Sequence, residues 1–215
     1  DEKIMNAKSV VMIQCVGCRN EDRNYCSRVC CSVSIKNALK LKELNPQMAI
    51  YILYRDMMTY GFKEAAYTAA REKGVLFSAY GLETKPRVSV EDGRVLVTFT
   101  DEILGHEATV HPDLLVLSTG IVPSEQQAGL AEIFSVKIDQ DGFYQEADYK
   151  WRPVDSIKEG VFLCDIGHAP RSITETIATA EAAAPSSTLK TISSSTDCFC
   201  TPERLMVNSF EAGLG

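Results

Sequence analysis

The sequence contains no apolar run near the roughly 20 residues that a helix needs to cross a bilayer. The longest candidate, Leu114 to Val122, is short and includes Ser118, Thr119 and Gly120. A basic segment followed by an apolar one is also missing, so we expect no signal peptide and a cytoplasmic location. The net charge of −7 provides no basic surface for a phosphate backbone. We therefore expect neither a transmembrane segment nor a nucleic-acid partner.

The sequence has eight cysteines, and their positions argue against a disulfide-rich secreted domain. Such domains are short and have few core residues, whereas this chain of 215 residues is 45% hydrophobic. Five of the eight cysteines lie between positions 15 and 31. Cysteines clustered in this way in an α/β sequence more often bind a metal or perform redox chemistry.

In the first 80 residues, apolar runs typical of buried strands alternate with segments of helical spacing. The sequence predicts strands at 9–14, 48–54 and 75–80, and helices at 32–44 and 63–73. Alternating strands and helices at this spacing predict a parallel sheet. Residues 87–90, 94–100 and 108–110 then alternate apolar and polar positions, and Asp92-Gly93 is a strong hairpin signal between the first two. An antiparallel β-meander is therefore expected after the parallel sheet.

The C-terminal half is predicted to contain two more buried strands and one helix. The strands are expected at 114–117 and 160–164, and the helix at 173–184, ending at Pro185. We expect a degenerate Rossmann-like domain over residues 1–112, a second segment over 113–185, and an irregular tail over 186–215. The tail is Ser/Thr-rich and lacks sustained periodicity.

The turn after the first strand lacks the glycine pattern of a dinucleotide-binding site. Such a strand normally leads into Gly-x-Gly-x-x-Gly, which lets a pyrophosphate approach a helix N-terminus. Here the turn reads Cys15-Val-Gly17-Cys18-Arg19, and only Gly17 remains of the pattern. Cysteine thiols therefore take the place of the usual phosphate cradle.

Soft thiolates that converge on one point suit an iron–sulfur cluster or a zinc ion. Cys26 lies one helical turn before Cys30, so a nascent helix would place both on one face, and Cys31 follows directly. Cys15 would complete a set of four. Cys18 is a rival ligand, because Cys15 and Cys18 could form a redox dithiol or share a zinc ion with Cys30 and Cys31. The chemistry of the residues alone leaves these alternatives open.

The pattern Cys15-x10-Cys26-x3-Cys30-Cys31 resembles the hallmark of the A subunit of heterodisulfide reductase. Three further stretches agree with this resemblance: Tyr54 to Met57, Asp113 to Pro123, and Gly160 to Pro170. It covers roughly Ser9 to Ala184 and fails in the tail. Cys18 is a departure, since the family usually has serine there.

The resemblance implies a partial chain of an iron–sulfur flavoprotein with a thioredoxin-reductase-like core. The expected cofactors are a [4Fe-4S] cluster on Cys15, Cys26, Cys30 and Cys31, and FAD. The implied function is electron relay between the two, within a complex of anaerobic metabolism. The implied partners are B- and C-type subunits and electron donors of the hydrogenase or formate dehydrogenase type. The alternatives are an assembly module stapled by zinc or a cluster, or a thiol–disulfide oxidoreductase that uses Cys15 and Cys18.

The same resemblance implies which residues contact FAD. They lie after the strand at 114–117, around the segment at 160–164, and in the first turn of the last helix: Ser118, Thr119, Gly120, Asp165, Ile166, His168, Glu175 and Thr176. The N-terminal Gly-x-Gly-x-x-Gly of an FAD domain is absent, so a complete flavin site would need residues outside this chain.

Three further positions have alternative interpretations. Arg55 lies where nicotinamide enzymes often hold a 2′-phosphate, but it could equally form a salt bridge with Asp56. His168 could contact flavin or only form a turn beside Pro170. Cys198-x-Cys200 is too incomplete for a ferredoxin motif.

Overall fold

The computed structural model describes residues 2–101, 103 and 105–193, and the chain divides into two compact units, Asp1–Gly120 and Ile121–Gly215. We call them unit 1 and unit 2. Cys198 and Cys200 lie outside the described residues, as does the end of the expected tail. The boundary follows Gly120, whereas the sequence suggested a division after residue 112. None of the described helices is both long and apolar enough to span a membrane.

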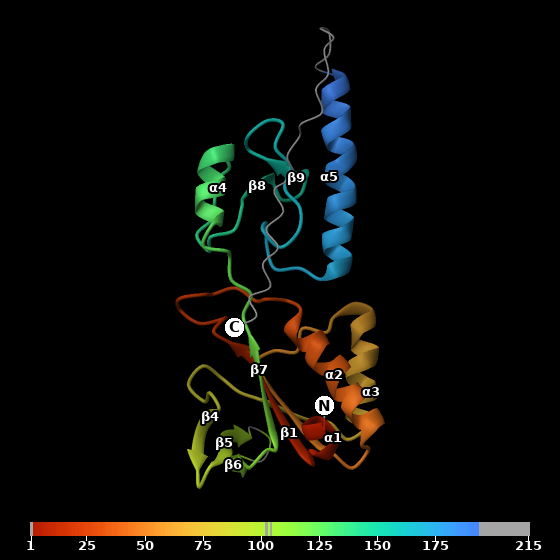
Figure 1. The fold of residues 1–215 in the computed structure, drawn as a ribbon, viewed down its shortest axis with the longest axis vertical. Helices are drawn as coiled ribbons and strands as arrows, with labels where there is room; N and C mark the ends of the chain where they lie inside the picture. Colours follow the sequence, from red (N-terminus) through yellow and green to blue (C-terminus); the bar gives the residue numbers. More distant parts are fainter. Residues whose placement is uncertain (1, 102, 104, 194–215) are drawn as a thin grey trace. The chain divides into compact units, whose positions relative to one another are not determined.

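Unit 1 contains a four-stranded parallel sheet in the order β3-β2-β1-β7 (Figure 1). After the short helix α1 (Glu2–Asn6), the parallel strands and the helices between them follow the predicted order: β1 (Ser9–Val16), α2 (Cys30–Leu44), β2 (Ala49–Tyr54), the short 3₁₀ helix η1 (Gly61–Lys63), α3 (Glu64–Glu72), β3 (Leu76–Ala79) and β7 (Leu114–Thr119). The meander β4 (Arg87–Glu91), β5 (Arg94–Asp101) and β6 (His106–Val110) is antiparallel. The predicted α/β class with an appended β-meander is confirmed.

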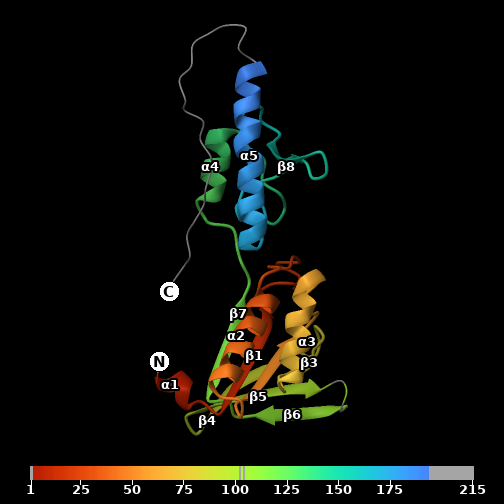
Figure 2. The ribbon, with the colours of Figure 1, turned by 90° about the vertical axis from the view of Figure 1, so that its right-hand side faces the viewer.

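The parallel sheet is covered on both faces, and the alternation of side chains along β1 shows how. Val10 and Met12 pack with residues of α2 and α3, such as Ile35. Val11 and Ile13 point to the opposite face and pack with residues of β5, such as Val97. Because successive side chains of a strand point to opposite faces, an unbroken apolar run places α2 and α3 on one side and the meander on the other (Figures 1 and 2).

The described part of unit 2 has short strands, a short helix and one helix of 21 residues around two small cores. Its elements are α4 (Gln127–Phe134), β8 (Glu146–Asp148), β9 (Arg152–Ser156) and α5 (Ile173–Ser193), and β8 pairs with β9. One core centres on Tyr144 and Leu163, and the other on Phe162 and Ala183. Of these elements, the sequence predicted only α5.

Two predictions in unit 2 are wrong. Residues 160–164 do not form a strand: Phe162, Leu163 and Cys164 are buried, but the segment makes only one isolated bridge, between Phe162 and Asp155. The apolar pattern predicted burial correctly, but no strand in the described residues continues the ladder. The helix α5 does not end at Pro185 but continues to Ser193. Proline removes one backbone donor, and the Ser186 hydroxyl donates to the carbonyl of Ala182 in that turn, at 3.0 Å.

Candidate functional site

The first of the clustered cysteines lies on a distortion of β1. The register between β1 and β7 shifts between Ile13 and Val16, so Cys15 sits on a bulge. Its φ of 59° lies in the left-handed region, which is uncommon for residues with a side chain and is often retained at functional sites. The bulge interrupts the regular alternation of side chains at Cys15. The sequence predicted the position of Cys15 at the strand end but not this conformation.

The cysteine loop, which we define as residues 17–29, connects β1 to α2. Gly17, Arg19 and Arg28 all have positive φ. The backbone N–H of Arg19 donates to the carbonyl of Tyr25, at 3.2 Å, and thereby closes the loop on itself. Cys26 lies in this irregular loop and not in a nascent helix, because α2 begins only at Cys30. The expectation that Cys26 and Cys30 share one helical face is therefore wrong, although both contribute to the same group of thiols.

The five thiols of this region are close enough to influence one another's ionisation. In the metal-free chain, burial raises the pKa of Cys15 to about 11, with further contributions from the thiols of Cys18, Cys31 and Cys26. Burial raises the pKa of Cys30 to about 11 as well, and Cys18, Cys31, Cys26 and Cys15 add to the effect. Several thiolates could not coexist here without a compensating positive charge. A metal centre supplies that charge and deprotonates the thiols that ligate it.

Hydrogen bonds reach several sulfur atoms of the group. The backbone N–H of Arg28 donates to the Sγ of Cys26 at 3.3 Å, and the thiol of Cys31 donates to the carbonyl of Asp56 at 3.7 Å. N–H···S bonds are among the features that set the potential of iron–sulfur clusters. In the part of the chain that the structure describes, no three His, Cys, Asp or Glu side chains are grouped so as to hold one metal ion. The ligands of a cluster bind different iron atoms and lie farther apart than the ligands of a single ion.

Gly120 packs directly against the cysteine loop. Its backbone N–H donates to the carbonyl of Val16 at 2.8 Å. A Cβ added at Gly120 would lie 2.8 Å from the Cβ of Cys18, closer than side chains normally approach. The Ser118 hydroxyl is within hydrogen-bonding distance of Ser34 on α2, at 3.2 Å. The small residues at the end of β7 thus have a role inside unit 1, which is to let the buried Cys18 and the loop close against the strand.

A pair of arginines joins the cysteine loop to the end of β2. The guanidinium of Arg19 pairs with Asp56 at 2.5 Å, and Arg55 donates to the carbonyl of Arg19. Asp56 therefore pairs with Arg19, and the alternative of a salt bridge between Arg55 and Asp56 is wrong. The charge of Arg19 lowers the pKa of Cys15 and Cys31, against the larger effect of burial. No role was predicted for Arg19, whose only signal in the sequence is a cation placed among cysteines.

The candidate flavin residues lie in different units. Ser118, Thr119 and Gly120 belong to unit 1, and the other five belong to unit 2. Asp165 is buried with a φ of 71°, and its carbonyl accepts a hydrogen bond from the N–H of His168 at 3.4 Å. Ile166 lies within this turn and is partly buried.

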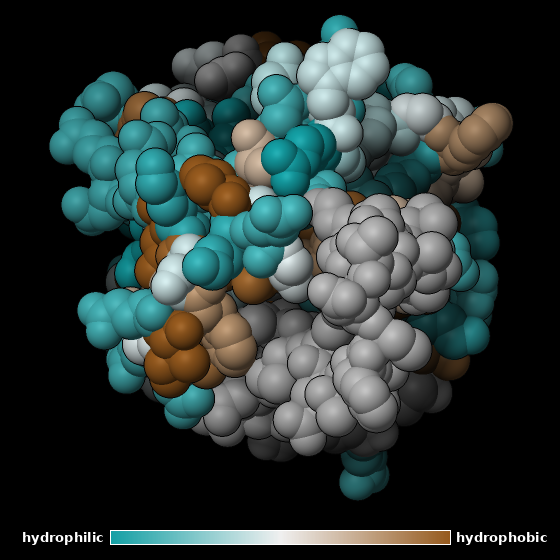
Figure 3. Space-filling model, turned by 90° about the horizontal axis from the view of Figure 1, so that it is seen from above, coloured by the Kyte–Doolittle hydropathy of each residue, from teal (hydrophilic) through white to brown (hydrophobic). Residues whose placement is uncertain are grey.

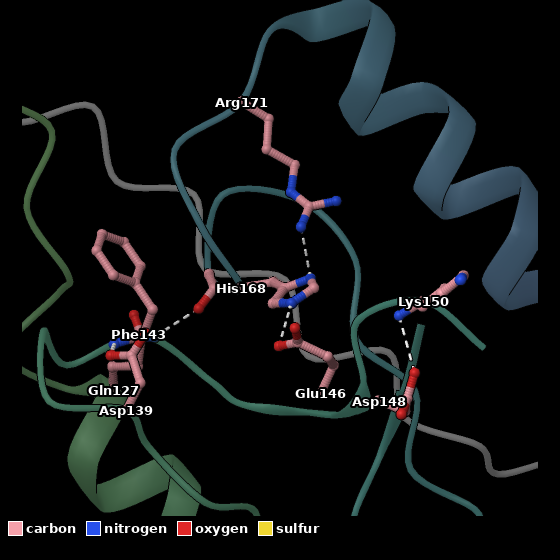
Figure 4. A network of polar contacts seen from close by, with 9 residues as sticks. Gln127, Asp139, Phe143, Glu146, Asp148, Lys150, His168 and Arg171 are labelled. Atoms are coloured by element: carbon pink, nitrogen blue, oxygen red, sulfur yellow. Dashed lines mark hydrogen bonds and ion pairs between the residues drawn. The ribbon is translucent and has the colours of Figure 1, made fainter. Parts of the chain in front are cut away.

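His168 is held between a cation and a carboxylate, as Figure 4 shows. Its Nδ1 is 2.7 Å from the guanidinium of Arg171, and its Nε2 is 2.8 Å from the carboxylate of Glu146. Because a guanidinium can only donate, Nδ1 accepts and Nε2 carries the proton that it donates to Glu146. Burial and the charge of Arg171 lower the pKa of His168. The ring is thus a structural link of unit 2, with both nitrogens engaged.

The first turn of α5 is closed by its own side chains. The carboxylate of Glu175 accepts from the N–H and the hydroxyl of Ser172, both at 2.9 Å, and the Ser172 hydroxyl accepts from the N–H of Glu175 at 3.3 Å. This reciprocal arrangement is a capping box. The N–H of Thr176 donates to the carbonyl of Ser172 at 2.9 Å. Glu175 therefore stabilises the start of α5. From the sequence we expected a flavin contact of Glu175, and this capping role was not predicted.

Comparisons with known proteins identify the relatives of this chain. The A subunit of ferredoxin:CoB-CoM heterodisulfide reductase from Methanosarcina acetivorans is 37% identical over 182 residues, which cover 82% of this chain and 22% of that protein. A protein from Archaeoglobus profundus, named for its likeness to the A subunit of heterodisulfide reductase, is 37% identical over 183 residues, covering 82% of this chain and 25% of its own length. The chain is related to the A subunit of heterodisulfide reductase. The resemblance carried by the cysteine pattern is thus confirmed.

The match covers a limited part of these heterodisulfide reductase proteins. The chain spans about a quarter of the length of the curated relatives, between 22% and 27%. No family model matches it. Among solved structures, the thioredoxin reductase of T. acidophilum has a TM-score of 0.56 at 18% identity, and that of Lactococcus lactis a TM-score of 0.57 at 15% identity. These matches cover 86% and 87% of this chain and 53% and 54% of the solved chains. This likeness confirms the fold predicted for the core.

Proposed function

We propose that the chain belongs to an electron-transfer oxidoreductase and holds a [4Fe-4S] cluster on Cys15, Cys26, Cys30 and Cys31. The cluster would exchange electrons with FAD. The observation that carries the proposal is the gathering of buried and partly buried thiols from β1, the cysteine loop and the start of α2. When bound, such a cluster takes up and returns one electron at a time. Its thiolate ligands are those that iron–sulfur clusters use in proteins.

The chain's own residues would hold the ligands and shape their surroundings. Three of the proposed ligands lie on β1 and α2: Cys15 at the bulge, and Cys30 and Cys31 in the first turn of the helix. The N–H of Arg28 donates to Cys26, and the charge of Arg19 favours the ionised form of Cys15. Both effects stabilise negative charge on sulfur, whereas burial opposes it. The balance between them is how this chain would tune the potential of the centre.

The two alternatives fit the geometry less well. A thiol–disulfide oxidoreductase needs a thiolate nucleophile at neutral pH, and a pKa of about 11 keeps Cys15 protonated in the metal-free chain. A structural zinc ion needs its ligands gathered tightly around one point. The described residues contain no such group for a single ion.

For the flavin, we propose that this chain provides only part of a site. Ser118, Thr119 and Gly120 would approach it from the end of β7, and Asp165, Ile166, His168, Glu175 and Thr176 would do so from unit 2. The side chains of Glu175 and His168 already have partners within unit 2, so their contribution would be to position the backbone of the turn and of the first turn of α5. Segment 160–164 is apolar and buried but bridged at one position only. A strand would have these features if one of its two neighbouring strands came from outside this chain.

The proposed assembly follows from the names of the relatives. Those names describe parts of heterodisulfide reductases that are linked to ferredoxin or to H2. We propose that this chain likewise works within a larger protein and a complex with B- and C-type subunits. Its electron donor would be a protein of the hydrogenase or formate dehydrogenase type.

Anaerobic purification followed by metal, sulfide and flavin analysis tests the proposal. The expected result is a brown protein with about four iron atoms and four sulfides per chain, little zinc, and substoichiometric flavin. A colourless chain with one bound zinc ion would support the assembly module instead. A chain without metal that cycles between a Cys15–Cys18 disulfide and dithiol would support the thiol–disulfide oxidoreductase. Stoichiometric FAD on the isolated chain would contradict the partial flavin site.

A further inference from the structure

A pocket of about 210 Å³ opens beside the cysteine loop in unit 1. It lies where β1 and β3 end, and the loop before the meander forms another wall. Its lining includes Cys15, Gly17, Arg19, Arg55, Tyr80 and Lys85. The ends of parallel strands are where α/β proteins bind their ligands. Cys15 is a proposed cluster ligand, but Cys26, Cys30 and Cys31 are not among the lining residues, so the pocket lies beside the proposed cluster and not between its ligands.

Three of the lining residues are cations in a chain whose net charge is −7. Arg19 is neutralised by its pair with Asp56. Among the described residues, no carboxylate pairs with Arg55 or Lys85. Arg55 is held in place because it donates to the carbonyl of Arg19, and its charge acts on the nearby Tyr80 hydroxyl, whose pKa it lowers against the larger effect of burial. Within the described part of the chain, the pocket thus has two cations that no carboxylate neutralises.

Size restricts the ligand that such a pocket could take. A volume of about 210 Å³ lies below the roughly 300–1,000 Å³ typical of pockets that enclose whole organic ligands. It is small for a dinucleotide and sufficient for a phosphate or diphosphate group. The planar guanidinium of arginine and the ammonium group of lysine are the donors that proteins usually use to bind such anions.

We propose that this pocket binds a small anion of the phosphate class, held by Arg55 and Lys85 beside Cys15. The binding itself does not require a cluster. A second consequence rests on the proposed function: an anion beside a cluster ligand disfavours the addition of an electron, so binding and reduction oppose each other. The pocket would then let a small anion regulate the potential of the centre.

Inorganic pyrophosphate is the probe for the binding step, measured by calorimetry on the purified chain at constant ionic strength. We expect one saturable site. Lys85→Gln should weaken binding about two- to fivefold, as for one exposed charge, and Arg55→Gln about tenfold, because that group is half-buried. Lys36→Gln and Arg94→Gln are matched controls that remove the same charges from exposed positions outside the pocket, and they should bind like the parent chain.

Lys85→Gln keeps the test decisive if Arg55→Gln disturbs the loop, because Lys85 is exposed and forms no ion pair with another described residue. The absence of saturable binding would overturn the proposal, as would equal losses in Lys85→Gln and Lys36→Gln. Tight binding of NADPH without binding of pyrophosphate would overturn the size argument.

The coupling is tested on the cluster-loaded protein by redox titration with and without pyrophosphate. The midpoint potential should fall in the parent chain and fall less in Lys85→Gln, whereas equal shifts in both would refute the regulatory part. If the chain takes up no cluster, the proposed function fails, but the calorimetry still decides whether the pocket binds an anion.

Discussion

Units 1 and 2 differ in the size of their apolar cores. In unit 1 the parallel sheet has α2 and α3 on one face and the meander on the other, and residues such as Ile50 and Ile52 are fully buried. In unit 2 the two cores have four buried residues each. Large apolar side chains remain exposed in both units, among them Phe62 in unit 1 and Trp151 at 77% and Ile173 at 81% in unit 2. Apolar residues, coloured brown, are visible on the described surface in Figure 3. Unit 1 has the layers of a complete domain, whereas the described part of unit 2 packs around small cores.

The largest expected effect on the free energy of unfolding comes from replacing isoleucine by alanine, and it should differ between the two units. Ile50→Ala removes a side chain that is 0% exposed, so it should lower the free energy of unfolding of unit 1 by about 2–5 kcal/mol. Ile173→Ala removes one that is 81% exposed, and unit 2 should change by less than about 0.5 kcal/mol. Denaturant unfolding monitored by hydrogen exchange in each unit measures both. Equal losses would mean that the exposed face of α5 is already packed within this chain.

A smaller effect is expected at two glycines. Gly120→Ala should destabilise unit 1 by about 1–3 kcal/mol because the new Cβ meets Cys18. Gly129→Ala is the matched control in α4, where a Cβ meets nothing within 4 Å, and it should stabilise unit 2 by up to about 1 kcal/mol. Thermal unfolding of the two variants compares them. A stable Gly120→Ala variant would show that the cysteine loop does not pack against β7 as described.

The smallest expected effect is a pH dependence confined to unit 2. Folding lowers the pKa of His168, because burial and Arg171 disfavour the imidazolium. The unfolded chain therefore binds the proton more readily, so the stabilisation is present above the ordinary histidine pKa of about 6.5 and is lost as the pH falls below it. The lowered pKa of Glu146 adds an effect of the same sign, lost at lower pH.

Hydrogen exchange at pH 7.5 and 5.5 measures this dependence, and we expect unit 2 to lose protection at the lower pH while unit 1 does not. His168→Gln should remove most of the difference. An unchanged pH response in that variant would assign the effect to another group.

The sequence predicted unit 1 far better than unit 2, for physical reasons. The unbroken apolar runs of β1 and β2 and the Asp92-Gly93 turn signal contain strong local information, and each was placed correctly. In unit 2 the segment 160–164 looks like a strand because its residues are buried, but a strand also needs a neighbour along its length. Pro185 lowers helix propensity locally, yet α5 continues through it. Local patterns predicted burial there but not the pairing that depends on distant residues.

The candidate site shows the same limit. The family resemblance implied that Cys15, Cys26, Cys30 and Cys31 act together. Their thiols influence one another's ionisation and so lie in one region, which also contains Cys18. The left-handed conformation of Cys15 and the contact between Gly120 and Cys18 depend on β7, which is about 100 residues away in sequence. The pocket with Arg55 and Lys85 likewise joins separate loops and has no sequence signature.

The most direct test of the central claim compares two serine variants of the anaerobically purified chain. Iron and acid-labile sulfide are measured, together with the electron paramagnetic resonance spectrum after reduction. If Cys15, Cys26, Cys30 and Cys31 hold the cluster, Cys30→Ser should lose the iron and the spectrum, whereas Cys18→Ser should retain both. Loss of the cluster in Cys18→Ser together with its retention in Cys30→Ser would contradict the proposed ligand set.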